Sequence, residues 1–398
     1  MTSENTLAGI TFSKQFPSAV EPLRGTFVAE QVLATRSRVE WAVIAPVPWV
    51  PRVLAPLLKR PFVKGADTLK GIRVERPRYP VLPRRLLYTR VAPAMAQFAT
   101  PAFRRVSHDL SPAFVHAHGI YPSGSAARRL CATTGIPLVI SVHGSDLYTN
   151  LSGTSWASEV RRTLSAAAEI VCVSNALARD VVALADADPR RVTVVPNTFD
   201  TTRFQLLDRK RGERLRLVSV GRLVPEKGFD LLIEGVARLR EAGEGVSLSL
   251  IGSGPQHSAL QQLADRLGVA ADVELKGSQS GEELLASFAD ADIFVSSSKR
   301  EGFGVAILEA LATGLPVVAT RVGGPEDFVG PDDGVLVAGD DVEALAEGIF
   351  ALANRLDSMD PAAISARAHL AFNPEAIAVR LCEVYDRAVE RASIGGGE

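Results

Sequence analysis

Short apolar runs alternate with longer amphipathic segments along nearly the whole chain. Ten such runs stand out: Val39–Ile44, Ala113–Ala117, Leu138–Val142, Ile170–Val173, Val192–Val195, Leu215–Val220, Ser247–Ile251, Val273–Leu275, Ile293–Ser296 and Pro316–Thr320. Most are continuous, which is typical of parallel strands that are buried on both faces. The segments between them have helical periodicity, as in Phe229–Arg240 and Ser258–Leu267. This alternation predicts an α/β fold with doubly wound sheets.

A polar segment without periodicity, Phe199–Arg214, separates the two series of strands, and we interpret it as an interdomain linker. We therefore predict a first Rossmann-like domain over residues 1–200 and a second over residues 201–373. The last long segment, Asn373–Ser393, has the pattern of a terminal helix. Two such domains create a cleft, and open α/β sheets bind ligands at the carboxyl ends of their strands.

Composition narrows the class of protein. The chain has 398 residues, 46% hydrophobic and 22% charged, with a mean hydropathy of +0.13, which describes a packed core. Its 44 Lys and Arg balance 45 Asp and Glu, so the total charge argues against a nucleic-acid partner. No apolar run reaches the roughly 18 residues of a membrane span, and Met1–Gly9 lacks the pattern of a secretory signal. The three scattered cysteines indicate neither disulfides nor a zinc site. We expect a cytoplasmic enzyme.

The near-zero net charge conceals a strongly basic stretch. Pro51–Arg105 contains 13 Lys or Arg and two acidic residues, together with apolar side chains such as Leu57 and Phe62. Two interpretations remain open. The stretch is either a solvated basic loop or a patch that docks on anionic lipid at the inner face of the cell membrane.

The segment Ser296–Thr320 carries the most informative chemistry. Gly302 and Gly304 flank the start of a predicted helix, where backbone N–H groups can approach an anion such as phosphate. Glu301 lies just before this helix and we place Glu309 two turns inside it. They are too far apart for a catalytic dyad, but they could hold hydroxyl groups at opposite ends of an elongated ligand. Alternatively, Glu309 is a surface residue and the glycines only shape a turn.

Two further strand-end loops have similar features. In the first, Gly221 is followed by Arg222 and Lys227, which offer a bidentate fork and a point charge to a phosphate. Arg outnumbers Lys 36 to 8, so a lysine here is less readily explained by composition. The alternative is two solvated loop cations. The second loop, Ile251–Pro255, is small and contains Gly254, which alone is a weak signal.

The first half offers a loop and three histidines. Within Thr11–Glu30 we predict a loop that ends in Arg24-Gly25-Thr26 and is followed by a helix from Phe27 to about Ala34. Gly25 at this helix entry would permit close approach of a diphosphate or sugar. His116 and His118 share one face of a strand, but no third metal ligand is evident, so we predict no metal site. We favour His118 at the cleft and His116 as structural. His143 ends the next strand, as a site group or as a satisfied core histidine.

Together these segments resemble a known family. EGFGVAILEALATGLPVVAT resembles the E-x7-E signature, and GRLVPEKGFD the Arg/Lys diphosphate loop, of retaining nucleotide-sugar glycosyltransferases with the GT-B fold, family four. VSNAL, VPNTFD, GSGP and SVHGSD match its other segments in order. VPNTFD departs from the commoner Pro-Asn-Gly-Val-Asp, and SSSKREGFG lacks the usual Pro-Ser, which leaves the fine donor contacts open. The opening residues look most like bacterial exopolysaccharide and teichuronic-acid-type transferases.

The resemblance implies a role for each candidate residue. Arg222 and Lys227 would bind the donor diphosphate, Glu301 the transferred sugar with the backbone N–H groups of Phe303 and Gly304, and Glu309 the ribose. His143 would lie near the reacting sugar, Gly25 would contact donor or acceptor, His118 would lie on the acceptor side, and Gly221 and Gly254 would line the donor site. The first domain would be the acceptor side, with residues 374–393 packing back onto it, and the second would bind the nucleotide sugar.

The implied reaction moves a sugar from a UDP- or GDP-sugar to an acceptor hydroxyl on a lipid-linked or polysaccharide acceptor, with retention and without metal or other cofactor. Asp290-Ala-Asp292 precedes a strand and is better interpreted as a helix end than as a metal motif. Two alternatives remain: a GT-B sugar-nucleotide 2-epimerase and a non-catalytic sugar-nucleotide binding module. A nicotinamide-dependent oxidoreductase is disfavoured because no G-x-G-x-x-G follows the first strand.

Overall fold

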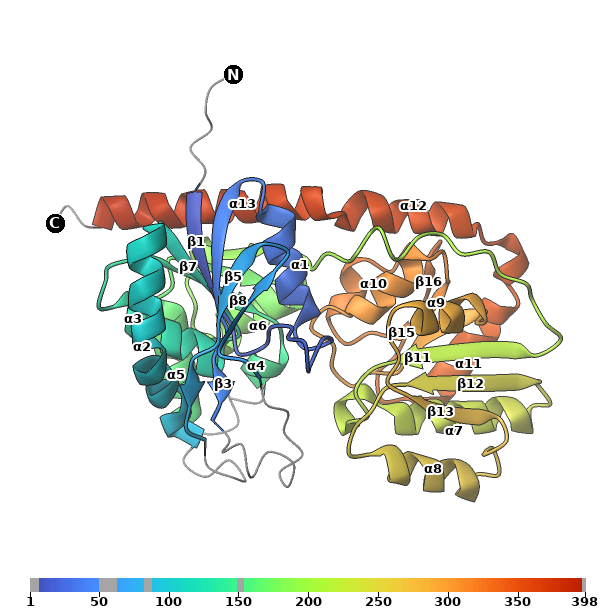
Figure 1. Cartoon of the computed structure of the whole chain (residues 1–398). Coiled ribbons are helices and arrows are strands. Elements are labelled where there is room, and N and C mark those ends of the chain that lie inside the picture. The colour runs from blue at the N-terminus through green and yellow to red at the C-terminus, as the bar shows by residue number, and fades with distance from the viewer. Residues whose placement is uncertain (1–6, 50–62, 82–87, 149–153, 396–398) are drawn as a thin grey trace. The chain divides into compact units, whose positions relative to one another are not determined.

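The computed structural model describes residues 7–49, 63–81, 88–148 and 154–395 (Figure 1). The chain divides into two compact units. Unit 1 contains the described residues up to Thr198 together with those from Pro374 onward, and unit 2 is Phe199–Asn373. No helix among these described residues is both long and apolar enough to cross a lipid bilayer.

Unit 1 is built on an eight-stranded sheet in the order β10-β9-β8-β7-β1-β2-β5-β4. Its strands are β1 (Leu7–Phe12), β2 (Val39–Ile44), β4 (Ala66–Leu69), β5 (Ile72–Glu75), β7 (Phe114–His118), β8 (Leu138–Val142), β9 (Glu169–Cys172) and β10 (Val192–Val194), with β3 (Val47–Pro48) and β6 (Arg78–Tyr79) as a separate pair. All neighbours in the large sheet are parallel except β4 and β5. Its helices are α1 (Thr26–Thr35), α2 (Val91–Leu110), α3 (Ser125–Cys131), α4 (Ser145–Tyr148), α5 (Thr154–Ser165), α6 (Asn175–Ala185) and α13 (Pro374–Gly395).

The central strand of this sheet, β1, is among the strands that the sequence pattern missed, as are β4 and β5 at one edge and the separate pair β3 and β6. β1 extends to Phe12 and pairs with both β2 and β7. The predicted loop follows it, and the predicted helix entry at Gly25 is confirmed, since Gly25 is the N-cap of α1. The sequence of β1 includes a glycine and a threonine, so it lacks a continuous apolar run. Gly9 is required for packing, since a Cβ there would lie 2.7 Å from the ring of Phe114 and 2.8 Å from that of Trp41.

Unit 2 has a six-stranded, wholly parallel sheet in the order β13-β12-β11-β14-β15-β16. Its strands are β11 (Leu215–Val220), β12 (Val246–Ile251), β13 (Val273–Gly277), β14 (Ile293–Ser296), β15 (Val317–Thr320) and β16 (Gly334–Val337). Its helices are α7 (Phe229–Glu241), α8 (His257–Arg266), α9 (Glu282–Ala289), α10 (Val305–Ala312), α11 (Val342–Ala353) and α12 (Pro361–Phe372). The predicted strands are confirmed to within two residues, and β16 is an additional edge strand.

The segment interpreted as a linker packs against unit 2. Phe199–Arg214 contains no helix or strand, but Phe204 is buried and its ring lies 6.3 Å from that of Phe288. The Arg209 guanidinium donates a hydrogen bond to the carbonyl of Thr313, 2.7 Å away. The segment is therefore a strap on the surface of this unit, a role that its charged composition did not indicate.

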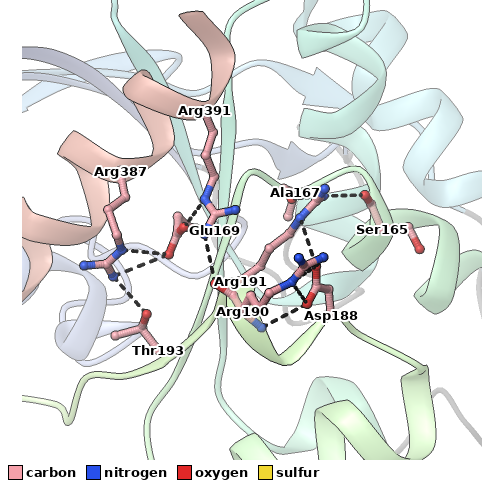
Figure 2. A network of polar contacts seen from close by, with 9 residues as sticks. All are labelled: Ser165, Ala167, Glu169, Asp188, Arg190, Arg191, Thr193, Arg387 and Arg391. Atoms are coloured by element: carbon pink, nitrogen blue, oxygen red, sulfur yellow. Dashed lines mark hydrogen bonds and ion pairs between the residues drawn. The ribbon is translucent and has the colours of Figure 1, made fainter. Parts of the chain in front are cut away.

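Helix α13 belongs to unit 1 although it follows unit 2 in the sequence. Its apolar side chains, such as Ile377, Leu381 and Tyr385, share a core with α1 and with one face of the sheet. Its basic side chains reach a buried carboxylate at the start of β9 (Figure 2). Nε of Arg391 lies 2.8 Å and Nε of Arg387 lies 3.4 Å from the two oxygens of Glu169, whose side chain is 1% exposed.

The two arginines hold more than the carboxylate. Arg387 also donates to the hydroxyl of Thr193 on β10 at 2.9 Å, and Arg391 donates to the carbonyl of Arg190 at 2.9 Å (Figure 2). The edge strand β10 and its neighbour β9 are thereby fastened to the last helix. The arginines are 38% and 39% exposed in their side chains, so only the carboxylate depends fully on its partners.

This asymmetry gives a prediction. Replacing both Arg387 and Arg391 by Ala leaves Glu169 buried and unpaired, and should lower the free energy of unfolding of unit 1 by about 3 kcal/mol. Glu169→Gln should cost less than half as much, because the released arginines can turn to solvent. Denaturant unfolding followed by tryptophan fluorescence measures this, since Trp41, Trp49 and Trp156 all belong to unit 1. Arg380→Ala is the matched control, because it removes an α13 arginine that bonds to the carbonyl of Val194 and not to Glu169. Equal losses of stability in the double arginine variant and in Glu169→Gln would contradict this prediction.

Candidate active site

The loops at the carboxyl edge of the unit 2 sheet contact one another through their backbones. Gly228, with φ of 62°, is the N-cap of α7, and a Cβ there would lie 2.0 Å from the carbonyl oxygen of Ser297 after β14. A Cβ on Gly252 would lie 1.8 Å from the carbonyl oxygen of Gly221. Only glycine allows this approach, which brings the loops after β11, β12 and β14 together at one edge.

Lys227 and Glu301, 74 residues apart in the sequence, meet at this edge. Nζ of Lys227 lies 2.5 Å from Oε2 of Glu301, and the hydroxyl of Ser298 lies 3.3 Å from the same oxygen. Lys227 ends a short 3₁₀ turn, Pro225–Lys227, after β11. The side chains are 26% and 15% exposed, so solvent screens the pair only in part. The structure thus joins two of the predicted site residues in an ion pair.

The backbone of the Glu301 loop is fixed by a segment that the sequence analysis did not single out, Val322–Gly324 after β15. The N–H of Glu301 donates to the carbonyl of Val322 at 3.4 Å, and the carbonyl of Glu301 accepts from the N–H of Gly324 at 3.0 Å. A Cβ on Gly324 would lie 2.3 Å from Cα of Phe303. The pair Gly323-Gly324, shortly after the end of β15, is the sequence feature that could have pointed to this segment.

Helix α10 starts later than the spacing suggested. Gly304, with φ of 99°, is its N-cap and Val305 its first residue, so Glu309 lies little more than one turn inside it and the prediction of two turns is wrong. The reason is that Gly302 to Gly304 remain in the loop. Phe303 is buried and its ring lies 4.9 Å from that of Phe328, while Glu309 is half-buried.

Arg222 and the two flanking glycines complete this edge. The exposed guanidinium of Arg222 forms no hydrogen bond or ion pair with any residue that the structure describes. Gly221 touches Lys227, because a Cβ there would lie 3.5 Å from Cδ of that lysine. Gly254 has a packing role, since its Cβ would lie 2.4 Å from the carbonyl oxygen of Leu223. An exposed guanidinium in the same strand-end loop as a lysine can bind an anion.

The remaining predicted residues lie in unit 1, at the carboxyl edge of its own sheet. Nδ1 of His118 lies 3.3 Å from Nε2 of His143, and the two rings are stacked with centroids 5.5 Å apart. Phe27 of α1 packs against His143, with centroids 4.6 Å apart. Gly25, with φ of 69°, is the N-cap of α1, and a Cβ there would lie 2.4 Å from the carbonyl oxygen of Gln15.

Asp146 organises this second edge, although the sequence analysis gave it no role. Its carboxylate accepts the N–H of Ile120 at 2.8 Å and the N–H of His143 at 3.1 Å, so it joins the loops after β7 and β8. Its position three residues after the strand-end His143 is the sequence feature that could have pointed to this role. His116 is structural, as favoured, since its two ring nitrogens contact Tyr385 and Ser141 at 3.0 and 2.8 Å.

Burial keeps the three histidines neutral. Loss of solvent lowers the pKa of His116 to about 3 and that of His143 to about 4, and lowers the pKa of His118 well below its usual value. Within the described part of the chain, Nε2 of His118 and Nδ1 of His143 are buried and have no hydrogen-bond partner. These imidazoles therefore act as neutral groups at physiological pH.

Solved structures share both units. A sucrose-phosphate synthase from Thermosynechococcus elongatus superposes with a TM-score of 0.79 at 18% identity, covering 97% of this chain and all of that one. HepE from Anabaena, in complex with UDP-glucose, superposes with a TM-score of 0.72 at 18% identity, covering 95% and 99%. Two Rossmann-like units with polar side chains at their carboxyl edges therefore define a GT-B fold, as predicted.

Sequence comparison specifies the family. The profile "Glycosyltransferase Family 4" matches residues 48–203, and "Glycosyl transferases group 1" matches residues 202–363. The putative teichuronic acid biosynthesis glycosyltransferase TuaC of Bacillus subtilis is 31% identical over 351 residues, 84% of this chain and 86% of that protein. A GDP-mannose-dependent phosphatidylinositol monomannoside mannosyltransferase of Mycolicibacterium smegmatis is 33% identical over 243 residues, 57% of this chain and 62% of that protein. The chain belongs to glycosyltransferase family four.

The neutral histidines give a pH prediction. Their pKa values are lower in the folded than in the unfolded chain, so the unfolded state takes up protons first as the pH falls below about 6.5. The free energy of unfolding of unit 1 should therefore fall between pH 6.5 and pH 4.5, by about 1.4 kcal/mol per pH unit for each histidine. His118→Asn should reduce the slope of the free energy of unfolding against pH by the contribution of one histidine. His108→Asn, which changes a side chain that is 90% exposed, should leave it unchanged; an unaltered slope in His118→Asn would refute the assignment.

Proposed function

We propose that the chain is a retaining hexosyltransferase that moves a sugar from a UDP- or GDP-sugar to an acceptor hydroxyl in the synthesis of a cell-surface polysaccharide or glycolipid. The observation that carries the proposal is the convergence of Arg222, Lys227 and Glu301 at one sheet edge, beside the N-terminus of α10. The relatives support a sugar-nucleotide donor, because one is named for GDP-mannose and one neighbour binds UDP-glucose.

In this proposal unit 2 binds the donor. Arg222 and Lys227 contact the diphosphate, Gly221 and Gly254 allow the donor close to the backbone, and Glu309 accepts hydrogen bonds from the ribose. The transferred sugar lies against Glu301 and the backbone N–H groups of Phe303 and Gly304. As the sugar–phosphate bond breaks, negative charge grows on the diphosphate, and two cations and a helix N-terminus stabilise it.

Unit 1 contributes the acceptor side. Neutral His143 lies near the reacting sugar, Gly25 allows donor or acceptor to approach the loop before α1, and His118 supports His143 from the acceptor side. A same-face displacement, in which the leaving phosphate takes the proton of the acceptor hydroxyl, gives retention and needs no covalent nucleophile.

The proposal includes metal independence. The two cations and the helix N-terminus at the unit 2 edge can supply the charge that a divalent metal would otherwise provide. The acidic pair considered above lies elsewhere, because Asp290 caps the end of α9 and the carboxylate of Asp292 pairs with Arg216 at 2.7 Å. Both residues lie at the amino edge of the sheet.

Transfer assays test this proposal. Purified protein, given labelled UDP-glucose or GDP-mannose and a bacterial lipid extract, should release nucleoside diphosphate only with the extract, equally with and without EDTA. Arg222→Ala and Lys227→Ala should each lower kcat/KM by about 100-fold, because each removes charge stabilisation from the transition state. The exposed Arg238 on α7 provides the control variant Arg238→Ala.

Three outcomes would contradict it. Near-normal rates in both variants would remove the diphosphate assignment. A free epimerised sugar without acceptor would favour the 2-epimerase. Donor binding without turnover on any extract would favour a binding module.

We further infer that the acceptor is reached at an anionic membrane surface through the basic stretch of unit 1. Residues 51–62 and 82–87 of that stretch lie outside the described residues, and its described part includes exposed Arg104 and Arg105 on α2. The protein should bind vesicles of phosphatidylglycerol at least about tenfold more tightly than vesicles of phosphatidylcholine. Arg104→Glu with Arg105→Glu should reduce this difference and Arg380→Glu on α13 should not. Equal binding to both vesicles would overturn the inference.

A further inference from the structure

The ion pair between Lys227 and Glu301 joins two residues to which the proposed function gives different ligands. In that scheme, Lys227 binds the diphosphate and Glu301 binds the sugar. Nζ of Lys227 and Oε2 of Glu301 are 2.5 Å apart, so each charge is neutralised by the other. A phosphate that contacts Lys227 must therefore share the ammonium group with the Glu301 carboxylate, which repels it, or displace that carboxylate.

Backbone contacts hold both loops, so only the two side chains need to move when a ligand binds. The backbone of Glu301 is held by Val322 and Gly324, and Gly228 fixes the turn after Lys227 against the carbonyl of Ser297. We therefore expect both main chains to stay in place when the ion pair opens. Among the side chains that the structure describes, the Ser298 hydroxyl is the other hydrogen-bond donor to the Glu301 carboxylate, and its contact is long, at 3.3 Å.

The nucleotide-sugar donor and the nucleoside diphosphate product differ in the groups that they offer to Lys227 and Glu301. A nucleotide sugar offers phosphate oxygens to Lys227 and hydroxyl groups to Glu301, so both displaced side chains regain partners. A nucleoside diphosphate offers phosphate to Lys227 and nothing to Glu301, whose half-buried carboxylate is left unpaired beside negative phosphates. Leaving a buried charge unpaired costs more than the pair itself contributes.

We propose that the Lys227–Glu301 ion pair discriminates the nucleotide-sugar donor from the nucleoside diphosphate product, and so promotes product release by re-forming when the sugar has left. This inference rests on the proposed function, because it assumes that sugar nucleotides bind at this edge. It adds that Glu301 acts against the product as well as on the sugar.

Calorimetric titration of the full chain with UDP, UDP-glucose, GDP and GDP-mannose tests the inference. In Glu301→Gln, Lys227 is free, so the matching nucleoside diphosphate should bind about five- to tenfold more tightly than to wild type. The nucleotide sugar should gain less or lose affinity, since the amide is a poorer acceptor for its hydroxyls. The ratio of the two dissociation constants should therefore shift toward the product, by about fivefold or more where the nucleotide sugar gains no affinity.

A matched control separates the ion pair from a general change of charge. Asp340 lies after β16 and its carboxylate pairs with Lys299 at 3.3 Å, in a side chain that is 71% exposed. Asp340→Asn removes the same charge from the same unit without touching Lys227, and should leave the ratio unchanged. Glu301→Gln is expected to fold, because the backbone contacts of residue 301 do not involve its carboxylate.

A double-mutant cycle distinguishes competition for Lys227 from simple repulsion between Glu301 and phosphate. In the Lys227→Met background, Glu301→Gln should no longer raise the affinity for the nucleoside diphosphate. If the gain persists there, or if Glu301→Gln leaves the ratio at its wild-type value, the inference is wrong while the proposed function stands. If wild-type protein binds none of the four ligands, the proposed function itself is wrong.

Discussion

Both units are organised by one constraint: a parallel sheet that is covered on both faces has no room for polar chemistry except at the ends of its strands. Strands such as β8 and β15 are buried along their whole length. Their side chains are therefore committed to packing, and the loops beyond them carry the charged and aromatic groups. The candidate residues therefore lie at the carboxyl ends of the strands or in the segments that follow them.

The loops can form a site only because their backbones approach closely. Gly228 and Gly252 allow carbonyl groups of neighbouring loops to lie where a Cβ would otherwise be. Beyond the strand ends, where the hydrogen bonds of the sheet stop, these contacts fix the positions of the loops relative to one another. The ion pair of Lys227 with Glu301 is a consequence of that arrangement, since neither residue is near the other in the sequence.

Much of this was accessible from the sequence, because long apolar runs and strand-end glycines have local physical causes. Strands β11 to β15 of unit 2, and a helix start near Gly302 and Gly304, were predicted in that way. Strand β1 was missed because its burial depends on Trp41 and Phe114, which fill the space over Gly9. The Lys227–Glu301 pair and the support from Gly324 depend on loops that only the folded sheet brings together, and no local pattern encodes such distances.

Helix α13 affects how the chain can assemble as it is synthesised. Unit 1 needs the side chains of α13 to complete its core and to neutralise Glu169, yet these residues leave the ribosome after the whole of unit 2. Unit 2 is continuous in sequence and can fold as soon as its last strand and helix have emerged. The usual N-to-C order of domain maturation is thereby reversed. The half of the protein that is translated first is the half that finishes folding last.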